Sequence, residues 1–510
     1  MISEIPIINL FAGAGGLAEG FCPVEQRRYF QIALTIEMNP AACKTLYLRN
    51  FCRLFPPRAL PGEYYQVVRR EISLEQLWRA WPAEAKEAER RTWQAELGNS
   101  DSCSEKELKS RIRKATGEGD RWVLIGGPPC QAYSKVGRNR NKGNPSYRPE
   151  NDGRLFLYQE YLKVLAQHQP PAFVFENVLG LLSASVDGRK LFPSMINDFS
   201  EPSKKLRRLG LAVPRVSYRL YCLNGDEFHP GKDDLRRLVV RTEELGFPQM
   251  RHRVILIGIR EDINCRPANL ILESKPTGAG RVINDLPKLR SGLSRGRDDL
   301  GSWREVIRSA AHSDWLAEAE LRFGCQLRSN IVEAVRSACS SILDRGGEFV
   351  AGGIEGSSWM REWYEDACLE GVLNHHSKEH MASDLHRYLF AAAHAATFGD
   401  SPRLSAFPRD LLPAHKNALS GKFPDRFRAQ TPSVPAKTIT GHISQDGHYF
   451  IHPDPSQCRS LTVREAARIQ TFPDNYLFLG GKVEQYIQVG NAVPPLLARL
   501  IADQVFQALT

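Results

Sequence analysis

Hydrophobic and polar positions along the chain predict alternating strands and helices. Residues 5–11 form a short apolar run, residues 12–16 are rich in glycine, residues 17–21 can open a helix, and residues 33–36 form a second apolar run. An apolar strand that leads through a glycine-rich turn into a helix is typical of a βαβ unit. We therefore expect the chain to begin with a strand, a turn, a helix and a second strand.

Three later segments, 122–125, 172–175 and 254–259, are apolar at consecutive positions. Strands that are apolar on both faces are typical of the centre of a parallel sheet, where helices cover both sides. They predict a doubly wound α/β sheet, and an apolar-patterned helix at 496–509 is expected to close the chain.

Two long segments interrupt this pattern. Residues 74–118 are charged and helix-prone, so we expect a helical insertion there. Residues 262–440 have a mixed composition, with Gly and Ser turns and an alanine-rich helical stretch at 388–396. No internal repeat is visible in either segment.

The composition is that of a globular protein. Of the 510 residues, 42% are hydrophobic and 25% are charged, and this length allows two or more cores. No stretch approaches the roughly 18 consecutive apolar residues of a membrane span, and no charged segment precedes the first apolar run, so we expect neither membrane insertion nor secretion. The eleven cysteines include no CxxC pair, which argues against a disulfide framework or a zinc knuckle and favours a reducing cytoplasm.

The net charge of +10, from 68 basic and 58 acidic residues, favours a polyanionic partner. Residues 271–370 contain 13 basic and 16 acidic residues, whereas residues 371–440 contain 9 basic and 5 acidic residues together with six histidines. We therefore expect the second segment to present a basic, histidine-rich face and the first to face away from a polyanion.

The glycine-rich turn has a loose form of the dinucleotide-binding fingerprint. Gly13, Gly15 and Ala18 have the required spacing, and Glu37 follows the second strand, where a ribose ligand is expected. Glycine lets the backbone approach a ligand closely. The motif alone also fits a simple tight turn, and it does not distinguish a dinucleotide from S-adenosylmethionine.

A stronger signal is the sequence Gly-Gly-Pro-Pro-Cys-Gln, which places Cys130 at the carboxyl end of a central strand. Open α/β sheets bind their ligands at that edge. A free cysteine is most often a buried structural residue, but the two prolines that stiffen this loop favour a nucleophile. Residues 134–148 contain five basic side chains among Gly and Asn, which fits either a solvated loop or contact with phosphate.

Two further motifs carry charged groups near this edge. Glu176 ends an apolar strand, where a carboxylate is either solvated or placed beside Cys130 for acid–base or hydrogen-bonding work. Gln249, Arg251 and Arg253 share one face of an extended segment. The arginines fit either a structural ion pair or an anionic or nucleobase partner.

Motifs near the C-terminus predict two helix starts. Thr462 and Glu465 have the spacing of a capping box. Asn491 precedes the terminal helix and is a candidate either for its cap or for a ligand contact. The helix that begins at Thr462 also fits a purely structural role.

Six motifs in this order resemble the DNA (cytosine-5)-methyltransferase family: Phe-Ala-Gly-Ala-Gly-Gly, Gly-Gly-Pro-Pro-Cys-Gln, Glu-Asn-Val, Gln-x-Arg-x-Arg, Arg-x-Leu-Thr-x-Arg-Glu and Gly-Asn-Ala-Val-Pro-Pro. The resemblance spans residue 7 to the C-terminus. It implies an α/β, Rossmann-like S-adenosylmethionine-dependent methyltransferase fold for residues 1–261, completed by residues 441–510. It also implies that residues 262–440 hold a second, smaller mixed domain for target recognition.

The chemistry of this family implies roles for four residues. Cys130 matches the nucleophile that adds to carbon-6 of cytosine and so activates carbon-5 towards the methyl group of S-adenosylmethionine. Glu176 matches the carboxyl group at ring nitrogen-3, and Arg253, together with Arg251, matches the groups that hold the base and support the thiolate. The target nucleotide must be rotated out of the duplex, and no metal is required.

The resemblance also implies which residues bind the cofactor and DNA. The cofactor pocket is expected to include Phe11, Gly13, Gly15, Leu17, Glu37, Met38, Pro129, Leu155, Asn491 and Val493. DNA is expected to contact Gln131, Ser134, Arg138, Arg140, Lys142 and Gln249, with the loop at 134–148 closing over the extruded base. Glu71 is a departure, because the family usually has an aspartate near the adenine amine.

We therefore expect a prokaryotic, cytoplasmic and nucleoid-associated enzyme that methylates double-stranded DNA as a monomer, with or without a partner restriction endonuclease. One alternative is a cytosine-5 methyltransferase of transfer RNA, but such enzymes have a much smaller region in place of residues 262–440. Another is a catalytically silent DNA-binding relative. Such relatives often lose the cysteine or the Glu-Asn-Val motif, and this chain keeps both.

Overall fold

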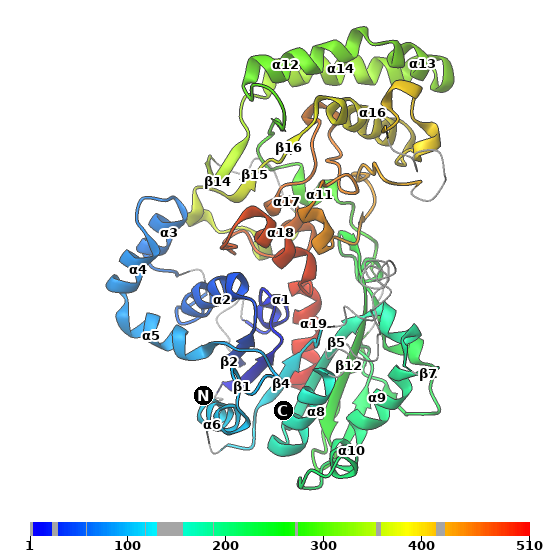
Figure 1. The fold of residues 1–510 in the computed structure, drawn as a ribbon. Coiled ribbons are helices and arrows are strands. Elements are labelled where there is room, and N and C mark those ends of the chain that lie inside the picture. The colour runs from blue at the N-terminus through cyan, green and yellow to red at the C-terminus, as the bar shows by residue number, and fades with distance from the viewer. Residues whose placement is uncertain are drawn as a thin grey trace.

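The structure is a computed structural model that describes residues 4–22, 29–57, 59–117, 119–129, 157–186, 188–270, 274–352, 359–414 and 424–510. A central sheet and its helices form the lower part of the molecule in Figure 1, and a largely helical part lies at the top. Helices from the C-terminal segment lie between the two parts. In the described parts of the chain, no helix has the length and apolar character needed to cross a membrane.

Nine strands of the described residues form one mixed sheet. Its order is β3 (Thr92–Gln94), β2 (Phe30–Glu37), β1 (Ile5–Leu10), β4 (Val123–Gly126), β5 (Ala172–Val178), β12 (His252–Arg260), β8 (Tyr218–Tyr221) and β9 (Glu227–Phe228), with β10 (Val239–Arg241) paired beside β12. The strands from β3 to β5 are parallel. The predicted α/β, Rossmann-like architecture is confirmed.

One strand direction was predicted wrongly. Residues 254–259 were expected to form a parallel strand, but β12 runs antiparallel to β5, β8 and β10, the three strands with which it pairs. Any strand that is covered on both faces is apolar on both faces, whichever way it runs. The hydrophobic pattern therefore reports burial and carries no information on direction.

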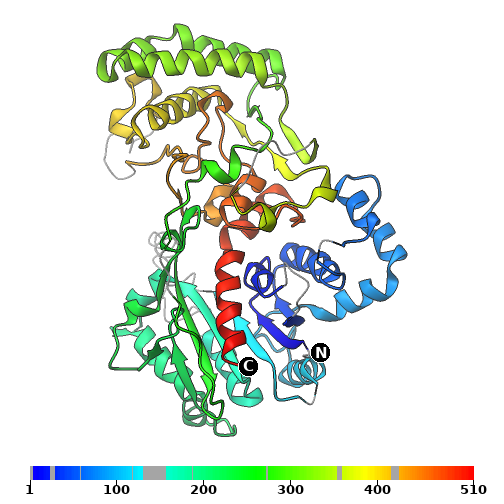
Figure 2. The ribbon, with the colours of Figure 1, turned by 180° about the vertical axis from the view of Figure 1, so that it is seen from behind.

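Helices cover both faces of the sheet, and the core consists of one apolar cluster on each face. Ile5 and Ile7 of β1 pack in a cluster with α1 (Gly16–Gly20) and α19 (Pro495–Gln507). The alternate residues Ile8 and Leu10 pack in a second cluster, with α6 (Glu105–Thr116), α8 (Leu157–His168) and α9 (Leu191–Ser200). Figure 2 shows α19 running down beside the sheet, so helices from near both ends of the sequence share one apolar cluster.

Residues 74–118 are helical as expected, but they also belong to the sheet. They form α4 (Leu74–Ala80), α5 (Pro82–Arg91) and α6, and between them the edge strand β3 pairs with β2. This strand was not predicted, because three residues are too few to show a period of two. Helices α3 (Gly62–Val68) and α4 pack against Leu369 and Leu373 of the upper part.

The upper part of the molecule has its own apolar core. It contains α12 (Leu300–Ser309), α13 (Asp314–Phe323), α14 (Cys325–Ser341) and α16 (Ala382–Phe398), below which β14 (Gly346–Ala351) pairs antiparallel with β15 (Gly371–His376). The predicted alanine-rich helix lies within α16, and its residues 388–395 are all buried. Shorter elements are α10 (Pro202–Arg208), α11 (Gly280–Ile283), α15 (Arg361–Tyr364), β6 (Ser185–Val186), β7 (Arg189–Lys190), β13 (Gly292–Leu293) and β16 (Glu379–His380).

The C-terminal segment joins the two parts. Helix α17 (Val463–Ile469) begins with the predicted capping box, since Thr462 accepts from the Glu465 amide and Glu465 accepts from the Thr462 amide. Arg468, which is fully buried, pairs with Asp474 and with Asp285, which follows α11 (Gly280–Ile283). A buried arginine with two carboxylate partners fixes how these segments meet. Helix α18 (Lys482–Asn491) follows.

Candidate active site

The glycine-rich turn lies at the carboxyl end of β1, directly beside the end of β2. Its backbone has left-handed φ values at Phe11 (53°), Gly13 (55°) and Gly15 (80°). The Glu37 carboxylate accepts hydrogen bonds from the amides of Gly13 and Asn39, each at 2.8 Å. Glu37 therefore holds the turn in place, and a carboxylate has further lone pairs with which to accept from ribose hydroxyls.

The C-terminal segment closes over this turn. A Cβ added to Gly16 would lie 2.2 Å from the Val493 carbonyl oxygen, and the Tyr476 hydroxyl donates to the Ala14 carbonyl. Gly13, in contrast, faces open space, with nothing within 4 Å of an added Cβ. The turn is thus packed on one side by the C-terminal segment and open on the other, which fits a cofactor pocket shared by both.

The other predicted pocket residues near this turn differ in exposure. Leu17 is buried in the core, which leaves only its backbone for a ligand, whereas Met38 is 56% exposed. Asn491 is exposed and ends α18. It does not cap the terminal helix, because Pro494 is the N-cap residue of α19 and no side chain caps it. The contact of Asn491 with a ligand stays a prediction.

Glu71 forms an ion pair with Arg69 (2.7 Å), in the loop between α3 and α4. The end of β3 lies beside Glu37, since Gln94 is the register partner of Glu37 and the Ala95 amide donates to the Glu37 carbonyl. The match of Glu71 to the family residue near the cofactor adenine stays a prediction.

Glu176 and Arg253 form an enclosed ion pair at the carboxyl end of β5. Arg253 Nε lies 2.8 Å from Glu176 Oε1, and the two side chains are only 10% and 12% exposed. A Cβ added to Gly127 would lie 2.6 Å from Glu176 Oε2, so the glycine lets the loop before Cys130 approach the carboxylate. Burial raises the pKa of the Glu176 carboxyl above its ordinary value, although Arg253 and Arg251 oppose this shift.

Asn177 supports the same loop and was missed as a site residue. Its side-chain amide donates to the Pro128 carbonyl (3.2 Å), and its own oxygen accepts from the Val178 amide (2.8 Å). Asn177 is 4% exposed. The signal was present in the sequence, because a buried asparagine beside the strand-end glutamate needs partners, and the nearby loop supplies one.

Gln249 and Arg251 are held by contacts within the protein, and their expected contacts with DNA and with the base stay predictions. Gln249 begins β11 (Gln249–Met250), which pairs with β17 (Ala436–Lys437). Its side-chain oxygen accepts from the Ile439 backbone amide, and its side-chain nitrogen donates to the Gln470 side-chain oxygen. Arg251 donates to the carbonyls of Ile439 (2.6 Å) and Gly490 (3.0 Å). Both side chains are 1% exposed, because segments distant in sequence cover this face of the strand.

The histidines of residues 371–440 do not form a basic face where the structure describes them. His375, His380 and His394 are buried. Burial lowers the pKa of His375 to about 4 and that of His380 to about 3, so both are neutral at pH 7. Positive charge on this segment comes instead from exposed side chains such as Arg403, Arg409 and Lys437.

Pro129 is the last described residue before the loop that carries the expected nucleophile. The other predicted site residues on this loop and beyond it lie outside the described residues: Cys130, Gln131, Ser134, Arg138, Arg140, Lys142 and Leu155. The described ends of β1, β4 and β5 all meet at the edge from which this loop departs.

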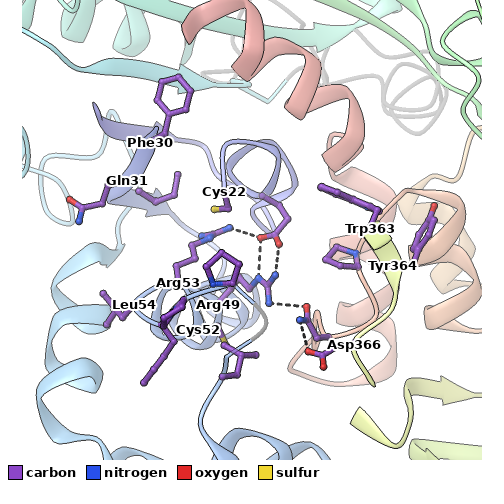
Figure 3. Close-up of a pocket in the computed structure, with 18 of the residues that line it drawn as sticks. Cys22, Phe30, Gln31, Arg49, Cys52, Arg53, Leu54, Trp363, Tyr364 and Asp366 are labelled. Carbon is purple, nitrogen blue, oxygen red and sulfur yellow. Dashed lines mark hydrogen bonds and ion pairs between the residues drawn. The ribbon is translucent and has the colours of Figure 1, made fainter. Parts of the chain in front are cut away.

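A separate cavity of about 250 Å³ lies next to α1 (Figure 3). It is lined by the end of α2 (Pro40–Cys52), the start of β2 and residues 362–366. Arg49 of α2 and Arg53, which follows this helix, pair with Glu19 of α1 beside the cavity. Of the predicted catalytic and cofactor residues that the structure describes, none lines this cavity, so we assign no part of the reaction to it.

Comparisons with known proteins agree with this geometry. The model of the C-5 cytosine-specific DNA methylase family matches residues 83–203 and 234–507. The Type II methyltransferase M.Bpa9945I of Bacillus paralicheniformis is 31% identical over 517 residues, which cover 98% of each chain. The DNA (cytosine-5-)-methyltransferase M.ApeKI of Aeropyrum pernix is 27% identical over 100% of this chain and 99% of its own. The chain therefore belongs to the C-5 cytosine-specific DNA methylase family, and its cofactor is S-adenosylmethionine.

Proposed function

We propose that this enzyme methylates carbon-5 of a cytosine within a specific sequence of double-stranded DNA, through a covalent adduct with Cys130. The observation that carries the proposal is the enclosed Glu176–Arg253 pair, at the same sheet edge as the glycine-rich turn. Cys130 follows directly on the described Gly-Gly-Pro-Pro segment, which approaches Glu176 at Gly127. A nucleophile, a carboxyl group and a cation are thus expected around one base.

The chemistry requires each of these groups. Addition of the Cys130 thiolate to carbon-6 moves electron density towards ring nitrogen-3. A carboxyl group with a raised pKa, such as Glu176, can donate a hydrogen bond or a proton there. Arg253 holds the same carboxyl group by its Nε and can bind the carbonyl oxygen of the base with its remaining donors. Carbon-5 then takes the methyl group, the methyl–sulfur bond breaks and the sulfonium leaves as a neutral thioether. Loss of the carbon-5 proton and expulsion of the thiolate restore the ring.

The residues around the glycine-rich turn fit the cofactor. Gly13 leaves open space, the Glu37 carboxylate can accept from ribose hydroxyls, and the Asn491–Val493 segment closes the other side. S-adenosylmethionine, when bound, supplies an electrophilic methyl group. The chain's own part is to orient it and to exclude water, since the turn is covered by Val493 and Tyr476.

We further propose that the target nucleotide is rotated out of the duplex, at a cost of about a few kcal/mol that protein contacts must offset. The basic loop at 134–148 supplies such contacts in this proposal. Neutralising Arg138, Arg140 and Lys142 together should weaken DNA binding and flatten its salt dependence, because fewer counterions are released. An unchanged salt slope would refute phosphate contact by this loop.

A role in restriction–modification, with or without a partner endonuclease, is also proposed. It is supported by the name of the relative M.Bpa9945I, a Type II methyltransferase. In this proposal the enzyme acts as a monomer on nucleoid DNA. Transfer RNA is the alternative substrate, and the large part between β12 and α17 argues against it.

The experiment is methyl transfer from labelled S-adenosylmethionine to double-stranded DNA and, in parallel, to transfer RNA. We expect label in DNA only, and bisulfite sequencing of DNA from cells that express the protein should then identify one modified sequence. Label in transfer RNA but not in DNA would overturn the substrate assignment.

A further inference from the structure

A short turn that no motif identified holds the backbone of the strand that carries Arg253. This turn is η5 (Thr242–Glu244), which follows β10. The Thr242 hydroxyl donates to the Gln249 carbonyl (2.5 Å) and accepts from the Arg251 amide (2.9 Å). Thr242 has no exposed surface. Through these two hydrogen bonds, Thr242 fixes the backbone around Arg251, the residue that separates β11 from β12.

Glu243, the residue after Thr242 in this turn, binds His252, the first residue of β12. Glu243 Oε1 lies 2.7 Å from His252 Nε2, and the side chains are 20% and 34% exposed. The antiparallel pairing of β10 with β12 sets Arg241 opposite His252, so the turn is held beside this histidine. The second oxygen, Glu243 Oε2, is buried and has no hydrogen-bond partner among the described residues. Among the described residues, His252 is thus the side chain that pairs with this carboxylate, through Glu243 Oε1.

His252 in turn holds Arg253 through its backbone. Arg253 Nη1 donates to the His252 carbonyl (2.8 Å), while Arg253 Nε meets Glu176 Oε1 (2.8 Å). Side chains alternate along a strand, so His252 and Arg253 leave β12 on opposite sides. The hydrogen bond between Glu243 and the His252 side chain therefore restrains the His252 peptide group, which orients Arg253. Neither Glu243 nor His252 needs to touch the base for this effect.

We propose that Glu243 and His252 are positioning residues, which hold the guanidinium of Arg253 against Glu176 for the methyl-transfer reaction. This inference rests on the proposed function. The competing interpretation is a partly exposed ion pair at the start of β12, which contributes little to stability and nothing to catalysis. The two interpretations differ in what happens to kcat when the protein stays folded.

The test compares Glu243→Ala with Glu243→Gln, whose amide oxygen can still accept from His252. We expect Glu243→Ala to lower kcat roughly 10-fold, within the ~100-fold that a 1 Å misplacement can cost. Its KM for S-adenosylmethionine should stay within twofold, because the cofactor turn is not involved. Glu243→Gln should recover most of the kcat. Glu244→Ala is the matched control, since Glu244 pairs with Arg241 in the same turn but is 58% exposed.

A second pair of variants covers the case in which Glu243→Ala does not fold. His252→Gln keeps a donor for Glu243, whereas His252→Ala does not, and the first should retain more kcat than the second. Equal kcat in wild type and Glu243→Ala would overturn the inference. Equal losses in Glu243→Ala and Glu243→Gln, or in both His252 variants, would also overturn it. A wild-type enzyme that transfers no methyl group to DNA would instead refute the proposed function.

Discussion

Gly16 is the position at which the cofactor turn and the C-terminal segment touch most closely, so we predict that Gly16→Ala weakens cofactor binding. The new Cβ would lie 2.2 Å from the Val493 carbonyl oxygen, 3.1 Å from Ala492 Cβ and 3.3 Å from Phe472 Cζ. A relaxed carbon–oxygen contact is roughly 3.3 Å. The Val493 carbonyl must therefore retreat by about 1 Å, and the segment that closes the pocket moves with it.

The size of the effect follows from overpacking, which typically costs about 1–3 kcal/mol. When this free-energy cost applies to the cofactor-bound state, in which the pocket is closed, the Kd for S-adenosylmethionine rises about 5- to 150-fold. Isothermal titration calorimetry measures the Kd directly, and thermal unfolding shows whether the variant is folded.

Gly62→Ala is the matched control for Gly16→Ala. Both glycines are the first residue of a helix, but an added Cβ at Gly62 meets nothing within 4 Å. The control should change stability by no more than about 0.5 kcal/mol and leave the Kd unchanged. A wild-type Kd in folded Gly16→Ala would refute the idea that the C-terminal segment completes the cofactor pocket.

Three further changes test other parts of the account. Glu176→Gln should lower kcat by about 10²- to 10⁴-fold, the usual contribution of an acid–base group, while cofactor affinity measured by calorimetry stays the same; retained turnover would contradict its role. Gln249→Ala should lower the free energy of unfolding by about 1–3 kcal/mol, because it orphans buried partners, and an altered salt slope of DNA binding would show that Gln249 contacts DNA after all. The pKa values of His375 (about 4) and His380 (about 3) lie below the unfolded value near 6.5, so the unfolded state takes up protons first as the pH falls. The free energy of unfolding that the neutral, buried histidines contribute is fully present above about pH 6.5 and is lost as the pH falls towards 4. Equal urea midpoints at pH 7 and pH 5 would contradict buried, neutral histidines.

The parts of the fold that follow from local pattern were predictable from the sequence. The apolar runs became β1, β2, β4 and β5, and the Thr462–Glu465 spacing became a real capping box, because both depend on residues only a few positions apart. Glu176 and Arg253 were expected at one edge, and the structure pairs them.

The parts that depend on distant segments were not predictable. Gln249 was expected to contact DNA, and its burial beside β17, almost 190 residues later, could not be seen in the local pattern. The histidines of residues 371–440 looked like a basic face, but the core of the upper part and the C-terminal segment bury three of them. The direction of β12 depends on the connection that precedes it, about which an apolar run says nothing.

The central claim is that Cys130 attacks a cytosine in DNA, and covalent trapping tests it most directly. A duplex that contains 5-fluorocytosine in the modified sequence blocks the final proton loss, so wild-type enzyme with S-adenosylmethionine should form a stable protein–DNA complex on a denaturing gel. Cys130→Ser should form none while it still binds the cofactor with wild-type affinity. A denaturation-resistant complex formed equally well by Cys130→Ser, or methyl transfer to DNA by that variant, would contradict the account.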